Sequence, residues 1–264
     1  MTPDRVAAAA AEWLWYPADA TVVHRDDLLV VRWPEYFAAG SPDVLRLGGS
    51  GSTATLLDEA CEVARGWGEG SLRVWVKLDA PDDLEDLLVA RGGQRKETLD
   101  VFALDLTGPR PDLGVPDDLE VVWQRDVSST RQVLEVGMAA FDEGSVPPED
   151  KLRELAAEAD ADHREGRGGS ALARLDGRAV ATGGLSLVGE VARLWGGGVV
   201  PDARGRGAYR AVLEERLRYA AEQGATMALV KGRVETSGPV LRRAGFAAYG
   251  QERSYLLALD EPVG

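Results

Sequence analysis

The sequence predicts an α/β fold with mixed sheets, built as two related domains in tandem. The chain has 264 residues, which is enough for two small domains that each bury a core. Short apolar and β-branched runs alternate with amphipathic helical patterns along the chain. Two landmarks recur in the same order, since Gly70–Lys77 resembles Gly224–Lys231 and Glu97–Asp105 resembles Glu252–Asp260. Such a repeat indicates two copies of one structural plan.

We expect the first domain over residues 1–110. Its predicted elements are a helix within 1–20, a strand over 28–33, a helix over 53–67, a strand over 72–78, a helix over 81–91 and a strand over 101–106. Pro81 suits the first helical position, and Asp82 and Asp83 in the first turn complement the helix dipole. Residues 107–116 hold three prolines and two glycines, which is the composition of a linker.

We expect the second domain over residues 111–264. A strand over 119–123 precedes a helix that Ser128 or Ser129 caps and that runs to about residue 141. A polar helix over 149–164 follows. The pair Asp176-Gly177 predicts a hairpin between strands over 171–175 and 178–187. A strand over 191–200, a helix that ends before Gly224, a strand over 226–230 and a short helix over 239–243 complete the order.

A glycine- and arginine-rich turn, Arg204 to Tyr209, lies between the strand over 191–200 and the following helix. Glycines there let successive backbone N–H groups point into one concavity at a helix N-terminus, which favours an anion. Two arginines add charge-assisted donors for phosphate oxygens, so the turn predicts a ligand that carries a pyrophosphate. The alternative interpretation of the turn alone is a solvated basic loop.

The second half resembles the GCN5-related N-acetyltransferase (GNAT) superfamily in the order of its residues and elements. Val199, Pro201, Arg204 and Gly207 come first, followed by an amphipathic helix, a short strand and the run 241–246. Arg204 and Gly207 match the coenzyme loop of that family, whereas Tyr209 takes its last small position. The resemblance implies two GNAT-like acyl-CoA N-acyltransferase domains and acetyl-CoA as the acetyl donor to a primary amine. It implies coenzyme contacts at Gly198, Val199, Arg204, Gly205, Arg206, Gly207, Ala208, Tyr209 and Ser237.

The resemblance also implies that the strand ending near residue 200 separates from the strand over 226–230. Unpaired backbone groups at Gly198 and Val199 would then meet the pantetheine arm, and an N–H would polarise the thioester carbonyl. The glycines at 196–198 permit a bulge and close approach. Their alternative role is a flexible strand end.

The catalytic groups of the family are only partly matched. Arg193 stands where many relatives place a carboxylate, so Glu190 is our candidate general base, with a turn residue as its alternative role. Leu241 stands where relatives often have a proton-donating tyrosine, and Tyr209 or Tyr249 are substitutes. Phe141, Glu143 and Trp195 are candidates to line the acceptor site, and core packing is the alternative for the two aromatic residues.

The first domain has lost the features of the coenzyme loop. Ser50-Gly51-Ser52-Thr53 stands where the second half has Arg204-Gly205-Arg206-Gly207. Both arginines are absent, and the β-branched Thr53 resists positive φ. We therefore expect a degenerate GNAT-like domain over 1–110 and a single coenzyme site in 111–264.

Composition limits the partners. The net charge of −14 argues against nucleic acid and would favour a cationic substrate, with solubility as the alternative role of the acidity. The expected partner is a small-molecule or peptide amine. Cys61 is the single cysteine and we expect it to be buried; with only two histidines, we expect neither a disulfide nor a metal. No apolar run is long enough for a membrane span, which indicates a cytoplasmic protein.

Two functions remain open from the sequence. The first is an active acetyl-CoA-dependent N-acetyltransferase. The second is a catalytically inactive acyl-CoA-binding or scaffold protein, which Arg193 and Leu241 at the positions of catalytic residues favour. The acceptor, the acyl chain length and the oligomeric state are open as well.

Overall fold

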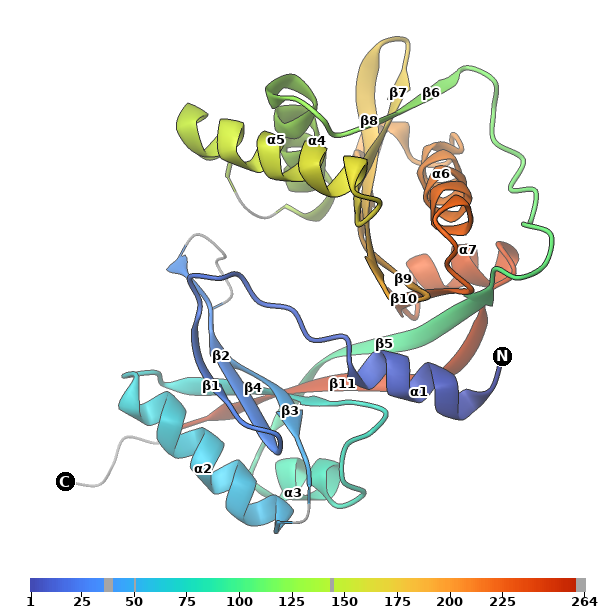
Figure 1. The fold of residues 1–264 in the computed structure, drawn as a ribbon. Helices are drawn as coiled ribbons and strands as arrows, with labels where there is room; N and C mark the ends of the chain where they lie inside the picture. Colours follow the sequence, from blue (N-terminus) through green and yellow to red (C-terminus); the bar gives the residue numbers. More distant parts are fainter. Residues whose placement is uncertain (36–39, 50, 143–144, 260–264) are drawn as a thin grey trace. The chain divides into compact units, whose positions relative to one another are not determined.

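The computed structural model describes residues 1–264 apart from 36–39, 50, 143–144 and 260–264. It divides into two compact units (Figure 1). Unit 1 comprises residues 1–101, 232–239 and 248–264, and unit 2 comprises residues 102–231 and 240–247. Within the described residues, no helix is long and apolar enough to cross a membrane.

Unit 1 has a mixed sheet in which β1, β2, β3, β4 and β11 are neighbours in that order. The β3–β4 pair is parallel and the other pairs are antiparallel. Helices α2 and α3 cover one face, where Leu57, Leu72 and Val74 are fully buried (Figure 1). The elements of this half are α1 (Pro3–Ala11), β1 (Thr21–His24), β2 (Leu28–Arg32), β3 (Asp43–Leu47), α2 (Thr53–Gly66), β4 (Ser71–Val76), α3 (Leu84–Ala90) and β5 (Gln94–Asp105).

Unit 2 has a mixed sheet in the order β6, β7, β8, β9 and β10, in which only the β9–β10 pair is parallel. Helices α4 and α6 contact β8 and β9, and α5 contacts β7. Its elements are β6 (Leu119–Trp123), α4 (Val127–Phe141), α5 (Glu149–Arg164), β7 (Gly168–Leu175), β8 (Arg178–Val188), β9 (Val191–Val199), a 3₁₀ turn (Pro201–Ala203) and α6 (Ala208–Glu222).

The last elements, β10 (Met227–Arg233), α7 (Ser237–Arg243) and β11 (Ala247–Ala258), cross the unit boundaries, as does β5. The units are therefore interleaved in sequence, because β11 pairs with β4 from Arg253–Val76 to Ala258–Ser71. The domains expected over 1–110 and 111–264 are continuous in sequence and meet at a single boundary, whereas each unit of the structure is made of separate segments. Their assignment as GNAT-like domains stays a prediction.

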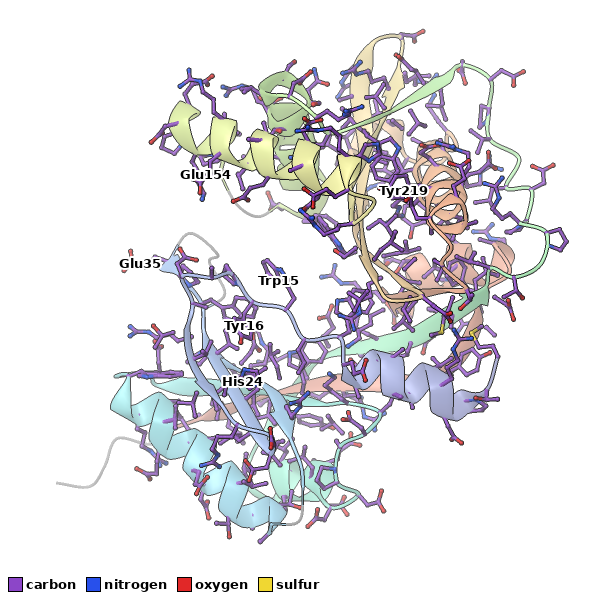
Figure 2. The ribbon with its side chains drawn as sticks, in the orientation of Figure 1. Trp15, Tyr16, His24, Glu35, Glu154 and Tyr219 are labelled. Carbon is purple, nitrogen blue, oxygen red and sulfur yellow. The ribbon has the colours of Figure 1, made fainter. Side chains whose placement is uncertain are left out.

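An aromatic cluster joins three elements of unit 2. The rings of Trp123, His163 and Tyr219 lie 4.7 to 4.9 Å apart, and the Tyr219 hydroxyl donates to the His163 carbonyl (Figure 2 labels Tyr219). The Trp123 Nε1 donates to Glu215 Oε1 at 2.6 Å. Because the three rings come from β6, α5 and α6, they fasten the long polar helix α5 to the unit.

Several expected elements are confirmed and others need correction. The helices over 53–66 and 149–164 and the hairpin at Asp176-Gly177 are present, and both turn residues have positive φ. Cys61 is buried in the core of unit 1. The cap of α4 is Asp126, which accepts from Ser129 N at 2.7 Å, so the expected serine cap is wrong. Helix α3 begins at Leu84 with Asp83 as its N-cap, so the first-turn positions expected for Asp82 and Asp83 and the first helical position expected for Pro81 are wrong.

Candidate functional site

The two parallel strands of unit 2 are paired over part of their length only. Their pairing runs from Met227–Val191 to Val230–Leu194, and β9 continues beyond it to Val199. This is the strand separation expected from the sequence. It leaves the last part of β9 beyond the region paired with β10, so an extended ligand has backbone available there.

A bulge lies in that continuing part of β9. The pairing with β8 shifts register between Thr182–Gly198 and Gly184–Trp195, so β9 holds one extra residue. Gly196 has a φ of +59°, which a glycine adopts without strain. The bulge expected from the three consecutive glycines is therefore present.

The two faces of the bulge meet different helices. A methyl group on Gly198 would lie 2.7 Å from Ala140 Cβ and 3.0 Å from Phe141 Cζ, both on α4. A methyl group on Gly197 would lie 2.9 Å from Tyr209 Cε2 on α6. Glycine at both positions therefore allows each helix to lie close to the strand.

The loop before α6 has the geometry of an anion site. Gly205 has a φ of +78° and Gly207, the N-cap of α6, has a φ of +88°. No side chain caps α6, so the first N–H groups of Ala208, Tyr209 and Arg210 lack an intrahelical acceptor. A methyl group on Gly205 would have no heavy atom within 4 Å. The loop thus offers open space at an uncapped helix N-terminus.

The two arginines of the loop behave differently. Arg204 Nε donates to Val199 O at 3.3 Å and its Nη2 donates to Ala140 O at 3.4 Å. Its side chain therefore joins the end of β9 to the end of α4; both arginines are exposed. Of the two, Arg206 is the better placed for a phosphate, and the contact expected for Arg204 stays a prediction.

Part of the expected linker is fixed on α6. Arg210 Nη1 donates to Leu113 O at 2.8 Å, and Leu113 N donates to Glu214 at 3.4 Å. A methyl group on Gly207 would lie 2.6 Å from Pro116 Cδ. Residues 113–116 therefore form a wall of the loop, which composition alone did not indicate.

Two half-exposed aromatic side chains lie on the α4 face of the bulge. Phe141 is 42% exposed and Trp195 is 45% exposed. The Trp195 indole lies over Gly184, where a Cβ would overlap it, and its Nε1 donates to Ser186 Oγ at 2.9 Å. The alternative of core packing is therefore wrong for both. Glu143, the third expected acceptor residue, lies outside the described residues.

Glu190 lies at the opposite end of β9 from the bulge. Its backbone O accepts from Thr226 N at 2.9 Å, and its Oε2 accepts from Thr226 Oγ1 at 3.2 Å. Eight residues of extended strand separate it from Gly198, which corresponds to about 26 Å. This position weighs against Glu190 as the general base.

Ser237 belongs to unit 1, and Leu241 is fully buried in the core.

Sequence reasoning missed Arg216, which is 1% exposed on the inner face of α6. Its Nη1 donates to Gly184 O at 3.0 Å and to Trp195 O at 3.4 Å. A signal was present, because Arg216 is four residues from both Val212 and Ala220 and shares their apolar face.

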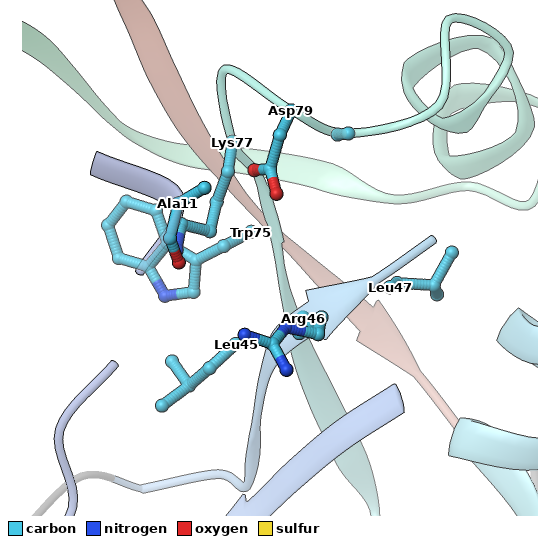
Figure 3. A pocket seen from close by; sticks show the side chains of 8 residues that line it. Ala11, Leu45, Arg46, Leu47, Trp75, Lys77 and Asp79 are labelled. Atoms are coloured by element: carbon cyan, nitrogen blue, oxygen red, sulfur yellow. The ribbon is translucent and has the colours of Figure 1, made fainter. Parts of the chain in front are cut away.

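Unit 1 contains a similar strand separation. The β3–β4 pairing consists of Asp43–Arg73 and Val44–Val74, after which β3 runs on to Leu47. A cavity of about 10 Å³ lies there, the size of one water molecule (Figure 3). It is lined by Ala11, Leu45, Arg46, Leu47, Trp75, Lys77, Asp79 and Ala80. Lys77 Nζ donates to Ala11 O at 3.0 Å, so the C-terminal end of α1 closes it.

The helix that follows this separation is capped by its own sequence. The Ser52 side chain accepts from Thr55 N at 3.5 Å. Thr53 Oγ1 donates to Asp83 Oδ1 at 2.6 Å, which places a carboxylate at the N-terminus of α2. An anionic ligand would meet a negative charge and an already engaged N–H group there.

Comparison with known proteins points to acetyltransferases. Residues 135–246 match the model of the acetyltransferase (GNAT) family. No curated protein matches the chain. Three similar solved structures are a GCN5-related N-acetyltransferase from Kribbella flavida, another from Sphaerobacter thermophilus and a tandem GNAT protein from the clavulanic acid biosynthesis pathway.

Their overlap with this chain is extensive. The Kribbella protein has a TM-score of 0.65 and 16% identity, over 93% of this chain and 90% of that one. The Sphaerobacter protein has a TM-score of 0.67 and 17% identity, over 92% of this chain and 77% of that one. The tandem protein has a TM-score of 0.62 and 18% identity, over 97% of this chain and 88% of that one. At these identities the likeness shows the fold alone. The family match covers residues 135–246, and the solved structures show that the fold is shared over most of the chain.

Proposed function

We propose that this protein is an acetyl-CoA-dependent N-acetyltransferase that transfers the acetyl group directly to a primary amine. The proposal rests on one observation above the others. In unit 2 the pairing of β9 with β10 ends at Leu194–Val230, while β9 runs on through a glycine bulge toward the uncapped N-terminus of α6. The GNAT match of residues 135–246 gives this geometry its chemical interpretation.

The residues present fit coenzyme A. The uncapped N–H groups of Ala208 and Tyr209, the open position at Gly205 and the exposed Arg206 would hold the pyrophosphate. The end of β9 at Gly198 and Val199 would pair with the pantetheine arm. The coenzyme supplies the acetyl group as an activated thioester.

The acceptor amine would approach on the α4 face of the bulge. Phe141 and Trp195 offer half-exposed aromatic surface there, which binds the apolar body of an amine and attracts its cationic form. The net charge of −14 raises the local concentration of cations. These features favour a cationic small-molecule or peptide amine.

The attacking amine must lose a proton. Asp142 follows Phe141 as the left-handed C-cap of α4, with a φ of 57°, and it is exposed. It is a better placed carboxylate than Glu190, because Phe141 contacts the Gly198 position directly. We propose Asp142 as the base, acting directly or through water.

Unit 1 would bind no coenzyme. The Ser52 cap, the Asp83 carboxylate and the closed cavity beside Lys77 each remove one requirement of the site. A single coenzyme per chain is expected, and unit 1 is a degenerate GNAT-like domain on this proposal.

Calorimetric titration with acetyl-CoA tests the proposal. Gly205→Asp places a carboxylate in the loop without a steric conflict, and Asp tolerates left-handed φ. Gly205→Asn is the uncharged match. Gly177→Asp, in a hairpin turn with the same φ of 78°, is the remote control. We expect one site in the wild type, a loss of at least about tenfold in affinity for Gly205→Asp, and near wild-type binding for the other two. Wild-type protein that binds no acetyl-CoA would refute the proposal.

The second candidate is a scaffold that binds acyl-CoA without catalysis. Arg193 and Leu241, at positions where relatives carry catalytic residues, favour it, and Leu241 is a core residue. A panel of amines separates the two. An enzyme releases free thiol from acetyl-CoA with at least one amine, whereas a scaffold binds the coenzyme and releases none.

A further inference from the structure

A buried cation lies directly behind the β9 bulge. Arg216 is 1% exposed, and its Nε donates to Val212 O at 3.2 Å. Its Nη1 donates to the carbonyls of Gly184 at 3.0 Å and Trp195 at 3.4 Å, which face each other across β8 and β9. The Tyr209 hydroxyl lies beside it, because a methyl group on Gly197 would be 3.5 Å from Tyr209 Oη and 3.6 Å from Arg216 Nη2. In the described part of the chain, no carboxylate pairs with it.

The strands are shaped to admit this side chain. A methyl group on Gly183 would lie 2.8 Å from Arg216 Cζ. A methyl group on Gly197 would lie 2.9 Å from Tyr209 Cε2 and 3.6 Å from Arg216 Nη2. Two glycines therefore make room for Arg216 and Tyr209 at the bulge itself.

The arrangement is costly for stability alone. Burial lowers the pKa of Arg216, and the neighbouring Tyr209 acts in the opposite direction. A guanidinium nevertheless stays protonated in proteins, so the charge remains. A buried charge without a counterion destabilises the folded state, whereas an apolar side chain of similar volume would not. A role in the site accounts for the charge better than packing does.

We infer that Arg216 is a positioning residue that fixes the β9 bulge through two carbonyl groups and supplies positive charge that favours the thiolate of bound coenzyme A. This inference rests on the proposed function. In the transfer, the amine nitrogen forms a bond to the acetyl carbon and the carbon–sulfur bond breaks with its electron pair on sulfur. The amine proton passes to the base or to water. The thiolate left on the coenzyme is the anion that a buried cation stabilises.

The test measures the thiol pKa of bound coenzyme A in a pH titration, with the ultraviolet absorbance of the thiolate as the signal. The same titration with desulfo-coenzyme A subtracts the ionisations of the protein. Arg216→Met removes the charge at similar volume. Arg218→Met removes one positive charge from the exposed face of the same helix, where Arg218 pairs with Glu215 and Glu222, and is the matched control.

We expect the thiol pKa of coenzyme A bound to the wild type to lie below that of the free coenzyme. In Arg216→Met it should rise by about one unit, which is about tenfold less thiolate at a given pH. Arg218→Met should match the wild type. A bound thiol with the pKa of free coenzyme in the wild type would overturn the inference even if a variant failed to fold. Equal values in wild type and Arg216→Met would overturn it as well.

A second measurement concerns the protein without coenzyme. Amide hydrogen exchange over residues 194–199 should speed up in Arg216→Met and stay unchanged in Arg218→Met, because the two carbonyl contacts that hold the bulge are lost only in the first. Unchanged exchange in Arg216→Met would overturn the positioning role. Absence of coenzyme binding in the wild type would instead refute the proposed function.

Discussion

Both units contain a parallel strand pair that separates near its end, followed by a loop and a helix, but they leave different groups open. In unit 2 the separation of β9 and β10 precedes a helix that no side chain caps. In unit 1 the separation of β3 and β4 is closed through Lys77 and Ala11, and Ser52 caps the next helix. The two units therefore differ in the side chains that satisfy the polar groups beside a similar strand separation, and we propose that this difference decides which unit binds the coenzyme.

Adding a side chain at Gly207, the N-cap of α6, should have the largest effect on stability and on acetyl-CoA binding. In Gly207→Ala the new methyl group would lie 2.6 Å from Pro116 Cδ, at a φ of +88° that disfavours Ala. We expect a loss of about 2 kcal/mol in stability and at least about tenfold in acetyl-CoA affinity. The double variant Gly207→Ala/Pro116→Ala should recover part of both losses. Calorimetry and thermal unfolding check this, and unchanged binding in the single variant would contradict it.

Opening the closed separation of unit 1 should affect stability alone. Trp75 is half-buried beside the cavity, and Trp75→Ala should destabilise unit 1 by about 2 kcal/mol. No second coenzyme should bind, because the Ser52 cap and Asp83 remain. Hydrogen exchange resolves the loss to unit 1, and a stoichiometry of two acetyl-CoA per chain would break the comparison.

Removing the cap of α2 should have a smaller effect. Ser52→Ala removes the acceptor of Thr55 N and should cost about 1 kcal/mol. Ser52→Gly, the residue type that caps α6, should cost only a few tenths. Denaturant unfolding of the two variants gives the difference. If Ser52→Ala were neutral, the cap would not distinguish the two helices.

The two units should also differ in the sign of their pH dependence. Burial raises the pKa of Asp43 above its ordinary 3.8, although Arg73 and Trp33 oppose this. The folded unit 1 then binds more protons, so this group makes it less stable as pH rises from 3.8 through the raised pKa. Burial lowers the pKa of His163 below its ordinary 6.5, and the positive charge of Arg125 lowers it further. The carboxylates of Asp160 and Glu215 act in the opposite direction.

Folded unit 2 therefore binds fewer protons at His163, and the contribution of this group to its stability is lost as pH falls from 6.5 through the lowered pKa. Asp43→Asn should flatten the first trend, and His163→Phe, which keeps a ring in the aromatic cluster, should flatten the second. Hydrogen exchange at several pH values, resolved by unit, measures both. Trends of the same sign in the two units would contradict the assignment.

Much of unit 2 could be predicted from the sequence because its signals are local. The hairpin at Asp176-Gly177 and the bulge at residues 196–198 depend on glycine, whose backbone freedom is readable from composition. The strands β1 and β3 were missed because they are only four and five residues long and no turn signal as strong as Asp176-Gly177 stands beside them, although β1 pairs with the adjacent β2. Short strands depend on tertiary contacts rather than on propensity.

The side-chain geometry of the site could be predicted only in part. The position of the loop was found, but the Arg204 contacts with Val199 and Ala140 were not, because they depend on where α4 ends. The same holds for Pro116 against Gly207. Glu190 was chosen because it is close in sequence to the family position, and eight residues of extended strand carry it away from the bulge.

The pairing of β11 with β4 has a consequence for synthesis. Arg253 Nη2 of β11 donates a hydrogen bond to Glu85 Oε2 of α3, which lies 168 residues earlier in the sequence. Unit 1 therefore lacks one of its strands until the ribosome has made nearly all of unit 2. At about 5 to 20 residues per second, this interval lasts roughly 10 to 30 s. During it the free edge of β4 is open to other strands. The nascent chain therefore exposes this strand edge for longer than a chain whose first half completes its sheet before the second is made.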